Sequence, residues 1–249
     1  MENNIFNQNP FQCRMDWGTR GVEEAAKRGD IIIIVDILSF STAVTTAVHF
    51  GAIIYPLDKK ADSKSFAELI GAEVAFGRTE AKELNKPSLS PASFGKHHED
   101  KKIVLPSVNG AACSVLSDGC KALLVGSFLN ATFVAEVAEK IQKENNASIT
   151  VIACGERWSD TKELRPCVED YLGAGIILSK LSGTKSPEAQ LCISAFKGSK
   201  ESLNDLVIDC SSGRELISMG FGDDIKYSTK VDSLKEVPIL EKNFFKKYI

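Results

Sequence analysis

The sequence predicts an α/β fold in which a largely parallel sheet is covered by helices on both faces. Runs rich in apolar and β-branched residues alternate along the chain with segments of helical spacing, which is typical of βαβ units. Several of the runs, such as Ile31–Val35, are apolar throughout, as expected of strands that are buried on both sides.

The elements follow one another in a regular order, strand and then helix. The expected strands are the short apolar runs Ile31–Val35, Ile53–Leu57, Val74–Phe76, Ile103–Leu105, Ala122–Val125 and Ile149–Cys154. The expected helices, where apolar residues recur at helical spacing, are Ser41–Phe50, Ser63–Ile70, Gly110–Leu116, Ala131–Glu144 and Val168–Leu181. Lys82–Asp100 has no period and is expected to be a long loop.

The last third of the chain continues the helical pattern. Helices are expected at Pro187–Phe196, Ser202–Ile208 and Ser212–Met219, followed by a strand at Ile225–Thr229 and a docked tail from Val237. We expect residues 1–249 to form a single α/β domain, in which the part after about residue 183 could form a subsidiary lobe.

Composition narrows the class of protein and its partners. A net charge of −3 gives no reason to expect nucleic acid or an anionic membrane as a partner. The 7 cysteines are odd in number and have no CxxC spacing, which favours free thiols in a reducing compartment. No apolar run approaches a membrane span. The sequence therefore predicts a soluble cytoplasmic protein.

Polar residues follow the predicted strands at the edge where ligands bind in open parallel sheets. Each also has a structural interpretation: Asp36 could cap the next helix, and Asn109 with Gly110 is a common turn pair. The candidates for catalysis or substrate binding at these strand ends are Asp36, Ser41, Thr42, Ser107, Asn109 and Asn130, of which Ser41, Thr42 and Asn130 could equally be helix caps.

The segment between the sixth strand and the next helix reads ACGERWSDTKELRPCVEDYLGAG and combines two arginines with five acidic residues. Glu169 and Asp170 are candidate catalytic residues and, with Asp36, candidate metal ligands, although they could be a solvated helix start. Arg157 and Arg165 are candidate phosphate contacts, although they could simply pair with the nearby acidic residues Glu156, Asp160 and Glu163.

The motifs that are absent restrict the chemistry further. There is no GxxxxGK[ST] loop, no convincing GxGxxG and no GxSxG elbow. The three histidines lack metal-ligand spacing, so a hard cation held by carboxylates, such as Mg²⁺, fits better than zinc.

A set of short motifs in fixed order resembles the 2-phosphosulfolactate phosphatase family. The motifs are MDWGTRG, VDILSFSTAVTTAV, SLSPASF, LPSVNGAA, VGSFLNAT, VIACGERW, EDYLGAG and SSGRELISMGFGDDI, and they span about Trp17 to Pro238. The resemblance implies a three-layer α/β/α fold and a Mg²⁺-dependent acid phosphatase. It also implies that the substrate is 2-phosphosulfolactate, which gives sulfolactate in the coenzyme M pathway.

Three positions depart from the pattern of the better-known members. Ser39 stands where an arginine is expected, Arg78 where a glutamate is expected, and Leu89 where an asparagine is expected. The lost arginine and glutamate affect the contacts to phosphate or sulfonate, so replacement charge is expected from Arg78, Arg157 or Arg165.

The function expected from the sequence is hydrolysis of a small anionic phosphomonoester, with Mg²⁺ as cofactor and the substrate as partner. Asp36 would hold the metal, or would instead be a covalent nucleophile. The alternatives are a phosphatase of a different metabolite, or a catalytically silent protein of the same fold that binds an anion. A homo-oligomer is compatible with the sequence.

Overall fold

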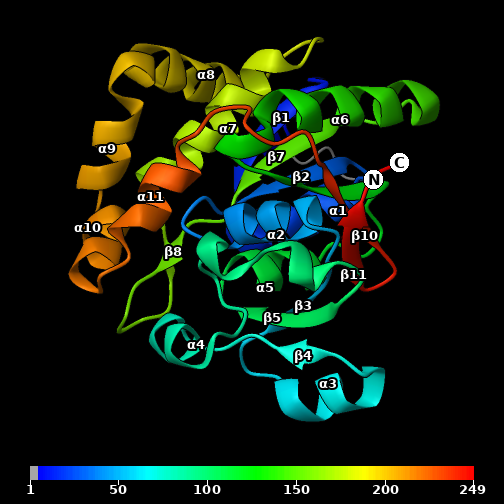
Figure 1. Cartoon of the computed structure of the whole chain (residues 1–249). Coiled ribbons are helices and arrows are strands. Elements are labelled where there is room, and N and C mark those ends of the chain that lie inside the picture. Colours follow the sequence, from blue (N-terminus) through cyan, green and yellow to red (C-terminus); the bar gives the residue numbers. More distant parts are fainter. Residues whose placement is uncertain (1–4) are drawn as a thin grey trace.

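A computed structural model describes residues 5–249 of the chain, and the start of the polar amino-terminal segment lies outside this part. Helices cover both faces of a central sheet (Figure 1), so the predicted three-layer α/β/α fold is confirmed. The strands are β1 (Cys13–Trp17), β2 (Ile31–Val35), β3 (Ile53–Asp58), β4 (Glu73–Val74), β5 (Lys102–Ser107), β6 (Ala122–Gly126), β7 (Ile149–Ala153), β8 (Glu156–Arg157), β9 (Leu164–Arg165), β10 (Pro238–Glu241) and β11 (Phe244–Lys247). The helices are α1 (Gly18–Lys27), α2 (Phe40–His49), α3 (Ser63–Ile70), α4 (Arg78–Leu84), α5 (Gly110–Val115), α6 (Ala131–Asn145), α7 (Val168–Lys180), α8 (Pro187–Ser199), α9 (Leu203–Asp209), α10 (Ser211–Ser218) and α11 (Gly222–Ser228).

The main sheet has the strand order β1-β7-β2-β6-β10-β11-β3-β5-β4. Neighbours are parallel from β1 to β6 and again from β3 to β4, as predicted. Between these two parallel groups lies the antiparallel hairpin β10–β11, which pairs Ile239 with Leu124 and Phe245 with Ile54. The tail that the sequence predicted only as docked therefore completes the middle of the sheet.

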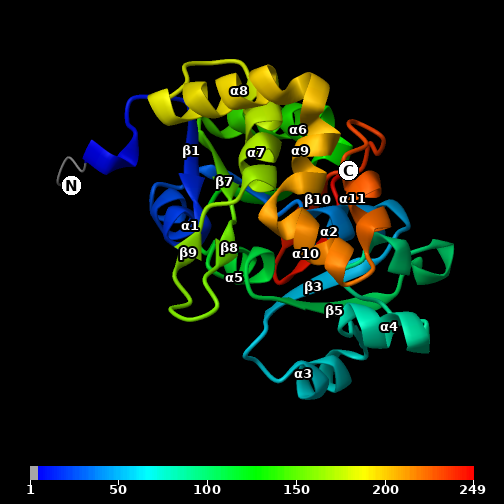
Figure 2. The same ribbon diagram turned by 90° about the vertical axis from the view of Figure 1, so that its left-hand side faces the viewer.

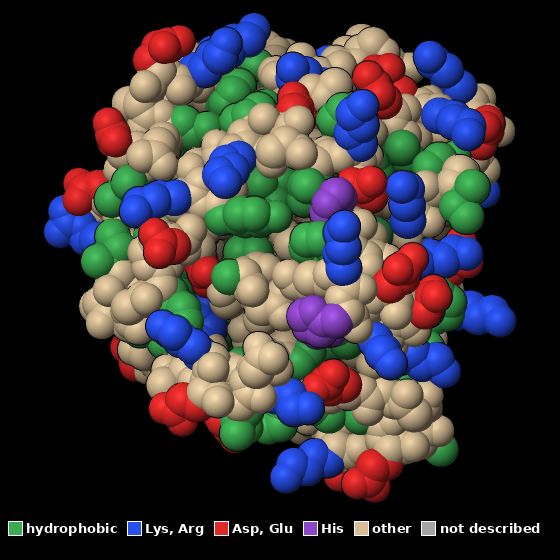
Figure 3. Space-filling view, viewed as in Figure 1, with side chains coloured by type: hydrophobic (Ala, Val, Ile, Leu, Met, Phe, Trp, Pro, Cys, Tyr) green, Lys and Arg blue, Asp and Glu red, His purple; other side chains and the backbone are tan. Residues whose placement is uncertain are grey.

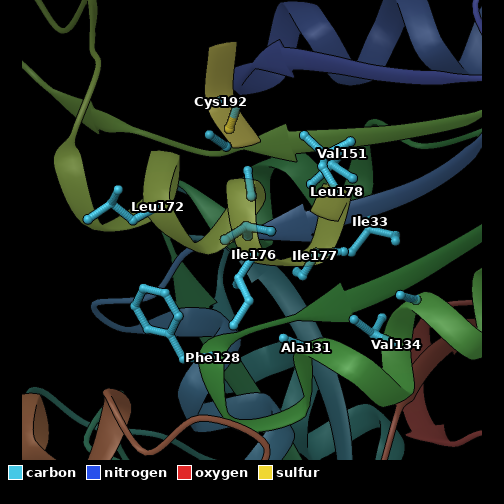
Figure 4. Packing of buried hydrophobic residues seen from close by; sticks show 14 of the residues in the cluster. Ile33, Phe128, Ala131, Val134, Val151, Leu172, Ile176, Ile177, Leu178 and Cys192 are labelled. Carbon is cyan, nitrogen blue, oxygen red and sulfur yellow. The ribbon is translucent and has the colours of Figure 1, made fainter. Parts of the chain in front are cut away.

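Strand β2 divides the hydrophobic core into two layers. Alternate side chains of a strand point to opposite faces, so Ile33 packs in a cluster with α6, α7 and α8, whereas Ile32 packs in a cluster with α1, α2 and α5. Figure 4 shows the first cluster, where Ile33 and Val151 of the sheet lie close to Leu178 of α7. Burial on both faces explains why this run is apolar throughout.

Two stretches differ from the expectation. Ile225–Thr229 is not a strand: Ile225–Ser228 belongs to α11, in which Ile225 and Ser228 are buried at helical spacing, and Thr229 is its C-cap. Five residues with one apolar side chain are too few to separate the two periods. The long loop expected over Lys82–Asp100 begins inside α4 and then contains the short 3-10 segments Pro91–Ser93 and Lys96–His98.

Helices α8 to α11 follow residue 183 and bring the chain back toward the sheet. Helix α8 packs closely on α7 at Gly175. The absence of a side chain there permits this approach, since a Cβ atom would lie 2.5 Å from the carbonyl oxygen of Cys192. Figures 1 and 2 show α9, α10 and α11 continuing from α8 along one side of the molecule. This path places α10 near the ends of the sheet strands, where the candidate site lies.

Neither the described helices nor the face shown in Figure 3 has a feature that points to a membrane span or a polyanion site. Within residues 5–249 no helix is long and apolar enough to cross a bilayer. Over the face shown in Figure 3, basic and acidic side chains are interspersed. The described residues of that face therefore form no continuous basic patch of the kind that binds phosphate backbones.

Candidate functional site

A cavity of about 520 Å³ lies where strands β2, β5 and β7 end. Both parallel groups of the sheet contribute to it, and helices α4 and α10 complete its wall. Its polar lining residues are Asp36, Ser39, Lys59, Ser63, Arg78, Ser107, Asn109, Glu156, Ser212 and Glu215. The cavity thus collects the ends of strands that lie far apart in the sequence.

Asp36 is buried at the tip of β2, and backbone groups fix both of its carboxylate oxygens. The N–H of Phe40 donates to Oδ1 at 3.1 Å and the N–H of Gly110 donates to Oδ2 at 2.9 Å. Only glycine fits at position 110, because a Cβ atom there would lie 2.3 Å from Cδ1 of Phe40. The Asn109-Gly110 turn therefore brings a donor from the end of β5 to the carboxylate at the end of β2.

Glu169 and Asp170 lie at the start of α7 and are 1% and 2% exposed, so they are not a solvated helix start. Asp170 joins two loops, since Oδ1 accepts from the N–H of Ile37 at 2.7 Å and Oδ2 from the N–H of Gly155 at 2.8 Å. Oε2 of Glu169 accepts from Sγ of Cys210 at 3.3 Å. These two carboxylates lie behind the cavity rather than among its lining residues.

Asn109 and Glu156 form a polar pair in the cavity wall. Nδ2 of Asn109 donates to Oε2 of Glu156 at 2.9 Å. Oδ1 of Asn109 is buried, and no group in the described part of the chain donates to it. A buried carbonyl oxygen without a donor is costly, and a ligand that accepts its lone pair, such as a cation, would remove that cost.

Three carboxyl groups of the site, those of Asp36, Glu156 and Asp170, have raised pKa values. Burial, with a smaller contribution from the charge of Glu169, raises the pKa of Asp36 to about 6. Burial and the charge of Asp36 raise the pKa of Glu156 to about 7. Burial first, and then the charges of Asp36 and Glu169, raise the pKa of Asp170 well above its usual value. Ionisation of these carboxyl groups therefore costs free energy in the metal-free site, and a bound cation would lower that cost.

The substrate-binding candidates lie in different surroundings. Ser107 lines the cavity, but the side chains of Ser41 and Thr42 are buried in α2 and bond to backbone groups of the β2 loop. Asn130 is buried in a 3-10 turn, where its side chain bonds to backbone groups that include the N–H of Ser127 and the carbonyl of Val125. The structure brings Ser107 to the cavity and leaves Ser41, Thr42 and Asn130 outside its lining.

Arg157 and Arg165 lie on the hairpin β8–β9, which extends below β7 in Figure 2. Nη1 of Arg157 donates to the carbonyl of Lys162 at 3.4 Å, and the guanidinium of Arg165 lies 5.9 Å from the ring centroid of Trp158. Neither residue is among those that line the cavity. Arg165 still affects the site, because its charge partly offsets the raised pKa of Glu156.

The donor atoms at the cavity fit a hard cation. Asp36, Glu156 and Oδ1 of Asn109 offer only oxygen, which is what Mg²⁺ prefers. A second group, formed by Cys167, Glu169 and Asp170, has one potential ligand atom from each residue within 4.8 Å of the others. Burial raises the pKa of the Cys167 thiol above its usual range, so this residue offers a neutral sulfur that suits Mg²⁺ poorly.

Comparison with known proteins identifies the family. The model of the 2-phosphosulpholactate phosphatase family matches residues 19–243, which is most of the chain. The chain belongs to this family. The 2-phosphosulfolactate phosphatase of Methanocaldococcus jannaschii is 23% identical over 87% of this chain and 92% of its own length. That of Methanothermobacter thermautotrophicus is 26% identical over 87% and 89%, and a probable 2-phosphosulfolactate phosphatase of Carboxydothermus hydrogenoformans is 26% identical over 83% and 84%.

Ser39, Arg78 and Leu89, the positions at which the resemblance leads us to expect other residues, lie together in the fold. Nη2 of Arg78 donates to Oγ of Ser39 and, at 3.3 Å, to the carbonyl oxygen of Leu89. All three residues line the cavity. The sequence signal for this cluster is the set of unexpected residues at its three positions. No local pattern in the sequence indicates that Glu156 lines the cavity.

Removal of the Glu156 charge is expected to alter how stability depends on pH in the metal-free protein. The pKa of Glu156 is raised from 4.5 to about 7 on folding, so its contribution is fully present below pH 4.5 and is lost as the pH rises through 7. Between pH 5 and 8 the wild type should lose about 2 kcal/mol more stability than Glu156→Gln. Urea unfolding in EDTA at both pH values measures this, and equal losses in the two proteins would contradict it.

Proposed function

We propose that this chain is a Mg²⁺-dependent phosphatase of small anionic phosphomonoesters, with 2-phosphosulfolactate as the substrate, giving 3-sulfolactate and phosphate. The observation that carries the proposal is the cavity at the strand ends, where a family member holds Asp36, Glu156 and an unpartnered Asn109 oxygen together. Buried carboxylates repel a phosphate dianion, so the site needs a cation between them before an anionic substrate can bind.

Asp36, Glu156 and Oδ1 of Asn109 would hold Mg²⁺, and Glu169 with Asp170 would add negative potential from behind. The bound ion supplies charge neutralisation of the phosphoryl oxygens. Asp36 is well suited to a fixed position, because the N–H groups of Phe40 and Gly110 hold its carboxylate in place. Asp170 acts on the same loop by fixing the N–H of Ile37.

The chemical step is displacement at phosphorus. The oxygen of a water molecule forms a bond to phosphorus, the bond from phosphorus to the ester oxygen breaks, and the departing alkoxide takes a proton. That proton comes from the attacking water, whose O–H bond breaks as its oxygen bonds to phosphorus, and Glu156, as a ligand of the cation, stays ionised.

A second candidate is a phosphatase of a different metabolite. The favouring observation is that Ser39, Arg78 and Leu89, which depart from the family pattern, meet in the cavity wall. A change in the wall alters which organic group fits beside the phosphate, but leaves the carboxylates that would serve the phosphoryl group in place.

Phosphate release decides among these functions. We expect the purified protein to release phosphate from 2-phosphosulfolactate with Mg²⁺, and EDTA should lower the rate by about 10³-fold. A panel of phosphorylated hydroxy acids and sugar phosphates tests the second candidate, which would be favoured by release from another compound and none from 2-phosphosulfolactate. Binding of these anions without any Mg²⁺-stimulated release would instead favour a catalytically silent binding protein.

A further inference from the structure

Arg78 is a cavity residue to which the proposed reaction assigns no step. Among the described residues that line the cavity, the cations are Arg78 and Lys59. Lys59 is exposed, whereas the side chain of Arg78 is only 13% exposed. A guanidinium that is largely removed from water needs acceptors for its N–H groups, because an unpaired buried charge is costly.

The hydrogen bonds of Arg78 leave one side of the guanidinium free. Nε donates to Oδ2 of Asp224 at 3.2 Å, and Nη2 donates to Ser39 and to Leu89. These contacts account for the N–H of Nε and for both N–H groups of Nη2. Within residues 5–249 no group accepts a hydrogen bond from Nη1, so two N–H groups remain for a ligand.

The guanidinium is fixed before any ligand arrives. Asp224 is buried, and its other oxygen accepts from Oγ of Ser90 at 2.7 Å. The ring of Phe221 lies 5.9 Å from the guanidinium carbon. A preorganised arginine loses little side-chain entropy when it binds an oxyanion, and it can bridge two carboxylates because its donors are arranged as a planar fork.

Arg78 also lies within reach of a small molecule held at Asp36. The carboxylate of Asp36 accepts from the N–H of Phe40, while Arg78 donates to the side chain of the preceding residue, Ser39. Two adjacent residues therefore connect the carboxylate and the guanidinium, and both groups line one cavity. A ligand with a phosphate and a second oxyanion on neighbouring carbons fits this arrangement.

We propose that Arg78 binds a second oxyanion of the substrate, a carboxylate or a sulfonate, and thereby selects phosphomonoesters that carry one. That the phosphate of the substrate lies near Asp36 rests on the proposed function. The positive charge comes from position 78 at the start of α4 and is held by Asp224 of α11.

The test compares four esters of one carbon skeleton in the presence of Mg²⁺: isopropyl phosphate, 2-phospholactate, 2-phosphooxypropane-1-sulfonate and 2-phosphosulfolactate. For Arg78→Met, kcat/KM should fall about 30-fold or more, mainly through KM, on the esters whose second anion Arg78 binds. It should change by less than about threefold on isopropyl phosphate. Comparison of 2-phospholactate with 2-phosphooxypropane-1-sulfonate shows whether Arg78 binds the carboxylate or the sulfonate.

Matched variants keep the test interpretable. Arg78→Lys retains a charge and should recover part of the lost affinity, whereas a purely structural role would not track the second anion of the substrate. Because Arg78→Met leaves the buried Asp224 unpaired, the double variant Arg78→Met with Asp224→Asn removes both charges together. Arg214→Met removes an exposed arginine of α10 that pairs with Asp209 and should behave as wild type.

Equilibrium binding separates failure of this inference from failure of the proposed function. Calorimetry with 3-sulfolactate, which carries no phosphate, should show binding to the wild type at least about tenfold tighter than to Arg78→Met, with inorganic phosphate unaffected. If the wild type hydrolyses none of the esters but shows this difference, the phosphatase proposal fails and the anion site stands. Equal losses on all esters, or no loss in turnover and binding, would overturn the role of Arg78.

Discussion

Replacement of Asp36 by asparagine is expected to lower the Mg²⁺-dependent kcat by about 10³-fold. The substitution removes a negative charge from the cavity and leaves an amide with a single acceptor oxygen. In the wild type, the N–H of Phe40 donates to one carboxylate oxygen and the N–H of Gly110 donates to the other. In the variant, the NH₂ group of asparagine would face one of these two donors. The substitution therefore removes the proposed metal ligand and one of the two hydrogen bonds that orient it.

A matched control is available at Asp232. Its carboxylate accepts from the backbone N–H and the hydroxyl of Thr132, but it does not line the cavity. Asp232→Asn should keep kcat within about threefold of wild type. Full Mg²⁺-dependent turnover by Asp36→Asn would show that the reaction does not need the Asp36 carboxylate. A phosphoryl adduct on Asp36 in quenched wild-type reactions would show that it is a nucleophile rather than a metal ligand.

Replacement of Asp170 by alanine is expected to destabilise the protein by about 3 kcal/mol. The buried carboxylate accepts from the N–H groups of Ile37 and Gly155, and alanine leaves both donors without a partner. Relief of repulsion from Asp36 and Glu169 offsets part of this loss, because those charges contribute to the raised pKa of Asp170. Two unsatisfied buried donors outweigh that relief.

Denaturant unfolding at pH 7 measures this effect as a lower midpoint with an unchanged slope. Asp170→Asn should lie between wild type and alanine, because its amide oxygen can still accept from one of the two donors. Asp209→Ala removes an exposed carboxylate that pairs with Arg214 and should change stability by less than about 1 kcal/mol. An unchanged midpoint in Asp170→Ala would mean that charge repulsion cancels both hydrogen bonds.

The sheet was predictable where the local pattern is strong. Ile31–Val35 has no polar residue and forms β2 with the predicted bounds, because a strand between two helical layers buries the side chains on both of its faces. Ser63–Ile70 likewise matches α3, whose start is fixed by Asp62 accepting from two backbone N–H groups. The hairpin β10–β11 was not predicted as strands, because its pairing with β6 and β3 depends on residues far away in the sequence.

The candidate site was predictable to a similar extent. Asp36 and Asn109 follow buried strands directly, and the structure places both in one cavity. The charge of Arg157 and Arg165 within an acidic segment predicts phosphate contacts, but the fold turns that segment into a hairpin whose arginines contact its own backbone and Trp158. Charge composition alone does not indicate which side of a hairpin faces a cavity.

The sequence by itself determined the alternation of strands and helices, the oxygen-rich donor set and the family. These features depend on periodicity, residue chemistry and motif order, which are local properties of the chain. Only the tertiary structure decided that Glu156 lines the cavity, that Asp170 joins two loops, and that Ser39, Arg78 and Leu89 meet. Such contacts join residues that are distant in the sequence, and the packing of layers fixes them rather than any propensity of the residues themselves.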